Sequence, residues 1–326
     1  MTNCILFFIG ILLLDLGTIF CLIGSSEICK KLKFSAVTIN LTVITLGSCL
    51  PGLTVSIVSG INHQGTLGLG AVLGGCLFQF CIVCGLEIMF YHRKIQRETL
   101  KMEYPFLLFS LIMLLFLMAD NLFFGFPSSN ELSRWDGVIL FLLLLLYVFM
   151  NGNSHVSMEV KNNRKDSKGY FKYIMLGIAG IVLLIPGGIW TCHYALNLIE
   201  MYGVREQTMS FLIIGILCQI PYLIFYLKNI SGNQMREEWG EYILDHTIYG
   251  NIFQMLLTYS ITCMIQPINV YSVGRKVPWL VWSLVVYILL HICLWLIWIL
   301  RKKVDRWQGS MLAAVFALFI VYISLN

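Results

Sequence analysis

Long apolar segments recur along the whole chain and leave little room for charged residues between them. Hydrophobic residues make up 58% of the 326 residues, whereas Asp, Glu, Lys and Arg together make up 12%. So few polar side chains cannot cover a water-facing surface, which excludes a soluble globular protein. The pattern predicts an all-α integral membrane protein. Because one span needs ~20 apolar residues, the chain accommodates about ten transmembrane helices.

The expected spans follow from hydropathy. They are residues 4–24, 37–59, 67–90, 105–125, 137–152, 171–195, 207–227, 243–266, 278–299 and 309–325. The N-terminal flank Met1-Thr2-Asn3 carries no positive charge, so we expect the first span to stay in the protein and not to act as a cleaved signal peptide.

Basic residues are distributed unevenly between the two ends of the expected spans. Of the 22 Lys and Arg residues, 18 fall on one side and four on the other. Cytoplasmic loops carry an excess of Lys and Arg. The asymmetry therefore predicts a multi-pass protein of the plasma membrane with both termini outside. The net charge of +5 is then a basic inner collar beside the lipid bilayer, and no nucleic-acid partner is expected.

Two expected spans contain a proline near the middle, within related motifs. The first half reads Gly47-Ser48-Cys49-Leu50-Pro51-Gly52-Leu53, and the second reads Leu217-Cys218-Gln219-Ile220-Pro221-Tyr222-Leu223. A membrane helix is interrupted only where the freed backbone groups face protein, water or a ligand. Paired interruptions in two halves are typical of transporters built from inverted repeats, which bind their ligand near the bilayer midplane. The motifs therefore predict a secondary transporter.

A long polar stretch divides the chain into two halves. We expect a first five-helix repeat at residues 1–153, a cytoplasmic linker at 154–170 and a second five-helix repeat at 171–326. Ser133-Arg134-Trp135-Asp136-Gly137, which opens the fifth span, is similar to Asp305-Arg306-Trp307-Gln308-Gly309, which opens the tenth. Because five is odd, consecutive halves must insert with opposite orientation, which makes them inverted repeats.

These motifs resemble the cation/calcium antiporter superfamily, which contains the sodium/calcium exchangers and their bacterial relatives. The family repeat reads G-T-S-x-P-E-L and is followed by a stretch that ends G-N-x-x-G-S-N-x-x-N. In the first half, Gly47 to Leu53 and Gly70 to Gln79 are similar to these two elements. In the second half, Leu217 to Leu223 and Asp245 to Gln254 are similar to them. The resemblance covers essentially the whole chain.

The resemblance implies a sodium/calcium-exchanger-like fold with ten transmembrane helices. It implies that broken second, third, seventh and eighth spans surround the ions, while the first and sixth slide across them for alternating access. It further implies that the two motif glutamates bind the ion, and this chain holds Gly52 and Tyr222 at those positions. The family asparagines correspond to Ala71, Cys76 and Gln79 in the first half and to His246, Asn251 and Gln254 in the second.

Loss of both motif carboxylates determines which ligand we expect. Calcium takes about 6–8 oxygen ligands that include carboxylates, and dehydrating it between neutral groups is unfavourable. Hydroxyl, amide and thiol groups at these positions suit a monovalent ion or a small polar solute better. The candidate ion-binding or substrate-binding residues are Ser48, Cys49, Gly52, Ser56, Cys76, Gln79, Cys218, Gln219, Tyr222, His246, Asn251 and Gln254.

Two carboxylates are candidates for coupling. Asp15 lies midway along the first span, where an ionised carboxylate costs roughly 2.5–3.5 kcal/mol unless it meets water or a partner. It is either a functional group or a protonated carboxyl that is hydrogen-bonded between helices. Asp245 follows Glu237 and Glu241 at four-residue spacing. This acidic face either collects cations at a cytoplasmic mouth or is an ordinary solvated surface.

Other polar residues in the apolar spans have simpler expectations. Glu87 and Asp120 lie near span ends, so we expect them to reach the membrane interface or to cap helices. His193 and His291 lie within spans, where we expect hydrogen bonds between helices, with proton relay as the alternative.

Three cysteines occupy motif positions. Cys49, Cys76 and Cys218, with His246, are compatible with a soft-metal site for copper or zinc. Ordinary packing of small thiols accounts for the same residues. The sequence leaves the metal question open.

The chain shows no Ser/His pair, metal motif or paired carboxylates, so we expect neither an enzyme nor a bound cofactor. We expect a sodium/calcium-exchanger-like transporter with an altered, non-acidic ion site. It would move an inorganic cation or a proton-coupled solute by alternating access. The alternative is a non-transporting relative, an accessory membrane subunit that binds a partner protein. Loss of both motif glutamates favours that alternative.

Overall fold

The structure is a computed structural model. It describes residues 1–32, 43, 45–90, 99–119, 131–151, 170–224, 243–270, 279–301 and 304–325, and for residues 151, 243–246 and 325 it describes the backbone alone. The expected linker at 154–170 and Asp120 therefore lie outside the described residues, apart from position 170. The division into two inverted repeats stays a prediction.

Helices make up nearly all of the described chain. In the first half they are α1 (Thr2–Lys31), α3 (Thr45–Ile61), α4 (Gly65–Phe78), η2 (Gln79–Cys84), α5 (Gly85–Phe90), η3 (Thr99–Glu103), α6 (Tyr104–Met118) and α8 (Arg134–Asn151). In the second half they are α9 (Tyr170–Tyr202), η5 (Thr208–Ile214), α10 (Gly215–Leu217), α13 (Ile243–Ile265), α14 (Trp279–Arg301) and α15 (Arg306–Leu325). Strands β1 (Glu131–Leu132) and β2 (Ile268–Asn269) pair antiparallel.

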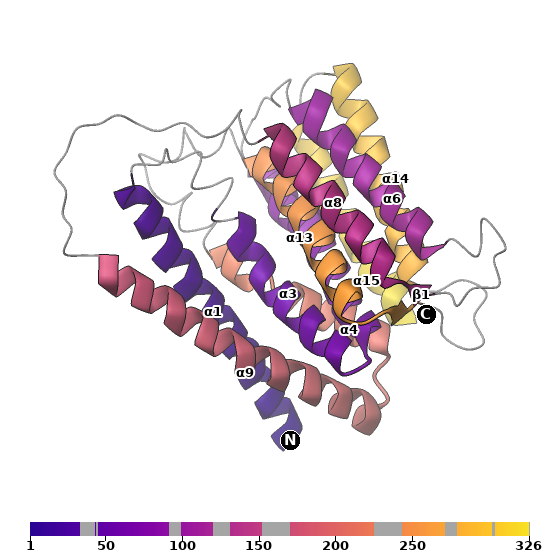
Figure 1. Ribbon diagram of the computed structural model, residues 1–326. Coiled ribbons are helices and arrows are strands. Elements are labelled where there is room, and N and C mark those ends of the chain that lie inside the picture. The colour runs from indigo at the N-terminus through magenta and orange to yellow at the C-terminus, as the bar shows by residue number, and fades with distance from the viewer. Residues whose placement is uncertain are drawn as a thin grey trace.

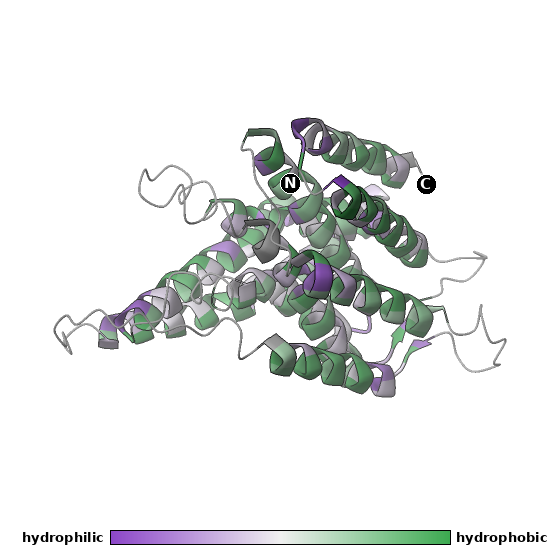
Figure 2. Ribbon diagram, turned by 90° about the horizontal axis from the view of Figure 1, so that it is seen from above, coloured by the Kyte–Doolittle hydropathy of each residue, from purple (hydrophilic) through white to green (hydrophobic). Residues whose placement is uncertain are grey.

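Hydropathy places this bundle in a bilayer. Among the described residues, seven helices are long and apolar enough to cross a membrane, and Thr45–Ile61 and Thr208–Ile224 are shorter apolar helices. Most of each ribbon is hydrophobic, and hydrophilic segments lie chiefly towards helix ends (Figure 2). The integral membrane, all-α prediction is confirmed. The count of ten spans, the membrane concerned and the positions of the termini stay predictions.

The two proline motifs behave differently. Helix α3 continues through Pro51 from Thr45 to Ile61, so the predicted interruption at this proline is wrong. In the second half, α10 ends at Leu217 and residues 218–219 form a turn before helix resumes at 220–224, so that interruption is confirmed. A proline inside a membrane helix is tolerated because neighbouring groups satisfy the freed carbonyl.

The predicted breaks in the third and eighth spans are also wrong. The third span is helical without interruption from Gly65 to Phe90, although its middle, Gln79–Cys84, is the π-helix η2. Helix α13 continues from Ile243 to Ile265. A π-helical turn changes which side chains share a face and often marks a functional site. Distortion of the third span therefore takes the form of a π-helix that begins at the candidate residue Gln79.

Helices α1 and α9 lie side by side, apart from the densest part of the bundle (Figure 1). Glycines at seven-residue spacing on α1, Gly10, Gly17 and Gly24, allow this close approach. A Cβ atom on Gly17 would lie 2.8 Å from the carbonyl oxygen of Gly180 on α9. Small residues at an interface let two membrane helices pack closely without a hydrophobic driving force. The two helices therefore form one tightly packed pair.

The similar motifs that open the fifth and tenth spans perform the same local task. At α8, the Asp136 carboxylate accepts a hydrogen bond from the Ser133 backbone N–H at 2.8 Å. At α15, the Gln308 side-chain oxygen accepts one from the Asp305 backbone N–H at 3.2 Å. Both are the return half of a capping box, in which a residue three positions into the helix bonds back to the N-cap. The sequence similarity thus reflects equivalent helix starts.

We predict that Gly180→Ala destabilises the fold whereas Gly177→Ala does not. A Cβ atom on Gly180 would lie 2.6 Å from the Gly17 carbonyl oxygen, whereas one on Gly177 would meet nothing within 4 Å. Overpacking typically costs about 1–3 kcal/mol, while alanine is up to ~1 kcal/mol better than glycine in a helix. Thermal unfolding of the detergent-solubilised variants should show a lower midpoint for Gly180→Ala alone. Equal midpoints would contradict the α1–α9 packing described here.

Candidate functional site

Helix α4 lies at the centre of the bundle, and glycines bring it very close to its neighbours. Of the seven candidate spans, the one that begins with α4 is the most buried. A Cβ atom on Gly74 would lie 2.1 Å from the Phe211 carbonyl oxygen, and one on Gly215 would lie 2.8 Å from the Ala71 carbonyl oxygen. The small residues Gly70 and Gly74 thus allow close helix packing. The backbone of residues 208–217 thus lies directly against α4.

This approach brings two candidate amides together. The Gln219 side-chain nitrogen donates a hydrogen bond to the Gln254 side-chain oxygen at 3.3 Å, and both residues are buried. Gly52 and Gly75 leave room for the pair. A Cβ atom on Gly52 would lie 3.3 Å from the Gln254 nitrogen, and one on Gly75 would lie 2.7 Å from the Gln219 nitrogen. Residues from α3, α4, α13 and the interrupted seventh span therefore meet at this amide pair.

A second polar group lies around Tyr222. Its hydroxyl lies near the side chains of Gln79 and Thr247, and all three residues are buried. Gln79 also faces Gly250, where a Cβ atom would lie 3.1 Å from the Gln79 amide nitrogen. Gln79 therefore faces α13 from the third span, just as Gln254 faces α3 from the eighth. The two motif positions, Gly52 and Tyr222, each lie beside one of these glutamines.

Several polar atoms in this region are buried and make no hydrogen bond within the described part of the chain. Asn251 uses its amide nitrogen to donate to the Tyr287 hydroxyl at 2.7 Å, but its side-chain oxygen has no described partner. The same holds for the Ser56 hydroxyl, the Gln219 oxygen and the Gln254 nitrogen. Each such atom costs about 1–3 kcal/mol. Concentrated unpaired groups of this kind indicate a place where a polar ligand binds.

The remaining predicted ligands do not form a metal site among the described residues. Ser48 and Cys49 both donate to the Thr45 carbonyl oxygen one turn earlier, at 2.8 and 3.1 Å. Cys76 and Cys218 are buried free thiols. Among the described side chains, no group of three or more His, Cys, Asp or Glu residues could hold a metal ion. The soft-metal interpretation gains no support from the residues that the structure describes.

Of the two coupling candidates, Asp15 has a described side chain and Asp245 does not. Asp15 is 8% exposed on α1, and its carboxylate lies close enough to the Cys218 thiol for electrostatic interaction. Cys218 immediately precedes Gln219 of the amide pair. Asp15 therefore lies near the interrupted seventh span. The side chains of Asp245 and His246 lie outside the described part of α13, so their predicted roles stay predictions.

The structure also places three polar residues of the spans that lie outside the candidate site. Glu87 is only 3% exposed, so the prediction that it reaches the membrane interface is wrong. His291 is buried and its Nδ1 lies 2.9 Å from the Tyr104 hydroxyl, which confirms a hydrogen bond between helices. His193 is exposed and pairs within its own helix with Asn197 at 3.4 Å, so the interhelical prediction is wrong for His193.

Sequence reasoning missed Thr247, Gly250 and Tyr287 as members of the candidate site. Thr247 and Gly250 lie inside the motif stretch Asp245 to Gln254, so their sequence position was a usable signal. Tyr287 lies on α14, outside both motifs. Its hydroxyl accepts a hydrogen bond from Asn251 of α13, and no sequence pattern indicates that contact.

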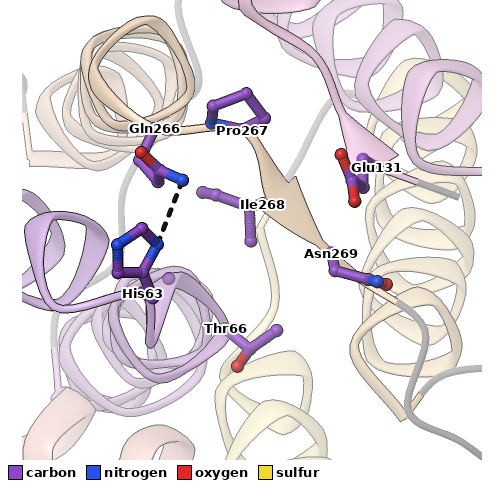
Figure 3. Close-up of a pocket in the computed structure, with 8 residues that line it drawn as sticks. His63, Thr66, Glu131, Gln266, Pro267, Ile268 and Asn269 are labelled. Atoms are coloured by element: carbon purple, nitrogen blue, oxygen red, sulfur yellow. Dashed lines mark hydrogen bonds between the residues drawn. The ribbon is translucent and has the colours of Figure 1, made fainter. Parts of the chain in front are cut away.

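A separate polar cavity lies beside the β1–β2 pair at one end of the bundle. Its volume is about 310 Å³, and its lining includes His63, Glu131, Gln266 and Asn269 (Figure 3). The Gln266 side-chain nitrogen lies 3.1 Å from His63 Nδ1, which connects the end of α13 to the turn after α3. No predicted ion-binding residue lines this cavity. It is therefore distinct from the candidate site.

Comparison with known proteins gives consistent matches over nearly the whole chain. The family described as sodium/calcium exchanger protein matches residues 2–152 and 172–325. The inner membrane protein YrbG of Escherichia coli is 21% identical over 326 residues, which span 97% of this chain and 94% of that one. The sodium/calcium exchanger MaX1 of Methanosarcina acetivorans is 20% identical over 352 residues, with coverage of 98% and 97%.

A solved structure matches over a similar extent. The sodium–calcium exchanger NCX_Mj aligns with a TM-score of 0.63 and 19% sequence identity, and the alignment covers 98% of each chain. This similarity shows that the two proteins share a fold. The fold predicted from the motif resemblance is confirmed by this match.

We predict that Gln219→Leu with Gln254→Leu is at least as stable as the wild-type protein. The substitutions remove one hydrogen bond together with two buried polar atoms that have no described partner. Replacing both partners of a buried pair by apolar groups is nearly neutral or stabilising, whereas removing one leaves the other unpaired at about 1–3 kcal/mol. Gln254→Leu alone should therefore lower the unfolding midpoint in detergent. A double variant less stable than this single variant would contradict the amide pairing.

Proposed function

Because the chain belongs to the sodium/calcium exchanger protein family, we propose that it is a secondary antiporter that moves a monovalent inorganic cation through a site at the centre of the bundle whose two motif positions carry no charge. It is an integral, multi-pass membrane protein, and the relative MaX1, which matches nearly the whole chain, is named a sodium/calcium exchanger. Membership supports a cation antiporter-like transporter. The choice of a monovalent cation rests on the residues at the site.

One observation carries the proposal. Oxygen atoms of Gln219, Asn251 and Ser56 are buried in the bundle and have no hydrogen-bond partner within the described residues. An arrangement that leaves several oxygens unpaired costs stability unless a ligand accepts their lone pairs. A cation is such a ligand, because it takes lone pairs and offers no competing acceptor. Amide and hydroxyl oxygens suit hard cations.

The charge at the site argues against calcium as the transported ion. Gly52 and Tyr222 occupy the positions of the motif glutamates, and neither supplies a carboxylate. Calcium takes about 6–8 oxygens, and its affinity rises with the number of charged ligands. Removing a divalent ion from water costs far more than removing a monovalent one, because the solvation energy grows with the square of the charge. A neutral site therefore favours a monovalent ion.

The arrangement of α1 and α9 supports alternating access. The pair packs together through its glycines, and α9 also touches α3, where a Cβ atom on Gly188 would lie 2.6 Å from Thr54. Leu14 of α1 belongs to the same apolar cluster as Cys218 beside the site. Small apolar contacts of this kind allow packed helices to slide with little loss of hydrogen bonding. Movement of the pair would change access to the amide residues.

The proposal is tested by reconstituting the full chain into liposomes. Uptake of sodium, potassium and calcium would be measured under imposed gradients of each other ion and of protons. We expect gradient-driven exchange of a monovalent cation and little movement of calcium. The Gln219→Leu/Gln254→Leu variant should fold but lose most of this flux. Calcium-only transport would contradict the neutral-site proposal, and no ion movement under any gradient would favour the accessory-subunit alternative.

We predict that restoring acids at the two motif positions creates divalent binding. In Gly52→Glu with Tyr222→Glu, the new side chains would extend towards Gln254 and towards Gln79, because those residues lie beside the two positions. Two carboxylates in one site supply the charge that calcium requires. Calcium binding, measured by calorimetry or by calcium-dependent thermal stabilisation, should strengthen about tenfold or more.

The matched control is Gly52→Gln with Tyr222→Gln, which adds the same bulk without charge. This control should bind calcium no better than the wild-type protein. If the glutamate and glutamine variants behave alike, the two positions do not face a common ion site.

A further inference from the structure

Asp15 is a buried carboxylate on the first span, near residue 218 of the interrupted seventh span. It lies on α1, is 8% exposed, and its Oδ1 atom is buried with no hydrogen-bond partner among the described residues. Thr18, one turn later, donates to the Leu14 carbonyl oxygen at 2.8 Å and does not satisfy the carboxylate. The carboxylate lies near the Cys218 thiol, which immediately precedes Gln219. Asp15 therefore lies near the start of the second proline motif, next to which Leu14 and Cys218 share one apolar cluster.

No described basic side chain neutralises Asp15. It forms no ion pair with a described residue, and Lys30 on the same helix pairs with Glu27. Lys30 is fifteen residues away on the same helix, about 22 Å at the rise of an α-helix. Helix α1 is faced by α3, α4, α9 and residues 208–224. Away from the helix ends, α1 and these elements carry further titratable groups, namely Cys21, Cys49, Cys76, Cys192, Cys218, His193, Tyr194 and Tyr222. The charged residues on these elements are Glu27, Lys30, Lys31, Lys172 and Glu200, all near helix ends.

A buried carboxyl in these surroundings has two stable forms. Protonated, it is neutral and needs no counter-charge. Ionised, it needs a cation close by, because an isolated charge inside the membrane is costly. A proton and a metal cation cannot neutralise the same single charge together. Occupation by one therefore excludes the other.

We infer that the Asp15 carboxylate is the shared binding group for a proton and the transported monovalent cation, so that each bound cation displaces one proton. The O–H bond of the carboxyl breaks, the proton passes to water on the side then accessible, and the cation takes its place beside the carboxylate. Charge is conserved at every step, and the exchange is electroneutral. The inference rests on the proposed antiporter function and adds the coupling ion and the stoichiometry.

The place of Asp15 on α1 gives the coupling a structural basis. Helix α1 packs against α9 at Gly10, Gly17 and Gly24, whereas Asp15 faces away from this seam towards Cys218. Neutral oxygens of the amide pair come from α13 and residues 218–219, which belong to the core of the bundle. The Asp15 carboxylate thus belongs to the α1–α9 pair, whereas the neutral amide ligands belong to the core of the bundle. Neutralising the charge lowers the cost of moving it past apolar neighbours, whichever of the two cations is bound.

The test uses full-length protein in liposomes with a pH-sensitive dye inside and the membrane potential clamped. An inward sodium or potassium gradient should make the interior of wild-type vesicles alkaline, because protons leave as cations enter. Asp15→Asn should reduce this signal about tenfold or more, and Asp15→Glu should retain much of it. Asp305→Asn is the matched control. It removes an exposed carboxylate that pairs with Arg301 and should leave the flux unchanged.

A second measurement requires no transport. In detergent, stabilisation of the wild-type protein by the same cation should weaken at lower pH, with the half-saturating concentration rising about tenfold per pH unit where the carboxyl is protonated. Asp15→Asn should show stabilisation that is weak and independent of pH, which a purely structural role for Asp15 would not produce. Its own unfolding midpoint without added cation shows whether the variant folds.

The outcomes separate this inference from the proposed function. If the wild-type protein exchanges a monovalent cation and Asp15→Asn does so equally well, or if uptake charges the membrane, the Asp15 inference is wrong while the antiporter function stands. If the Gln219→Leu/Gln254→Leu variant and the wild-type protein both move no cation, the proposed function is wrong and the inference with it.

Discussion

The candidate site depends on how closely the backbone of α4 approaches residues 208–217. In lipid no hydrophobic force brings helices together, so close packing must supply the association energy. Gly74 lies against the Phe211 carbonyl and Gly215 against that of Ala71, at distances that no side chain could share. This contact fixes the interrupted seventh span so that Gln219 meets Gln254 of α13. A bulkier residue at either glycine would separate the amides before it changed the helices themselves.

Glycines that face the backbone of a neighbouring helix also occur at the edge of the bundle, where they join two helices and do not position polar ligands. Helices α1 and α9 pack along Gly10, Gly17 and Gly24, and both expose large apolar side chains on their other faces. The contact between α4 and residues 208–217 positions polar side chains that must stay together. The contact between α1 and α9 joins two helices whose surroundings are largely apolar. Apolar surfaces present no directional bonds that resist sliding. The fold therefore combines fixed polar ligands with a helix pair whose surroundings are largely apolar.

Some predictions were within reach of the sequence, and others were not. The repeated S-R-W-D-G and D-R-W-Q-G motifs indicated equivalent helix starts, and the structure shows the same capping bond at both. The interruption at Cys218 and Gln219 was also indicated by proline and its neighbours. Proline failed as a guide at Pro51, where α3 remains helical, because a membrane helix tolerates proline where neighbouring groups can satisfy the freed backbone group. Glu87 is buried although its position near a span end suggested exposure to the interface.

By itself the sequence determined the solvent in which this protein folds, the approximate positions of its spans and the absence of carboxylates at residues 52 and 222. Those properties belong to single residues or to local composition, so hydropathy and motif order reveal them. Only the tertiary structure decided that Gln219 pairs with Gln254, that Tyr287 meets Asn251 and that Asp15 lies beside Cys218. These contacts depend on the rotation of each helix about its axis and on approaches of a few ångströms, and neither is encoded within one segment.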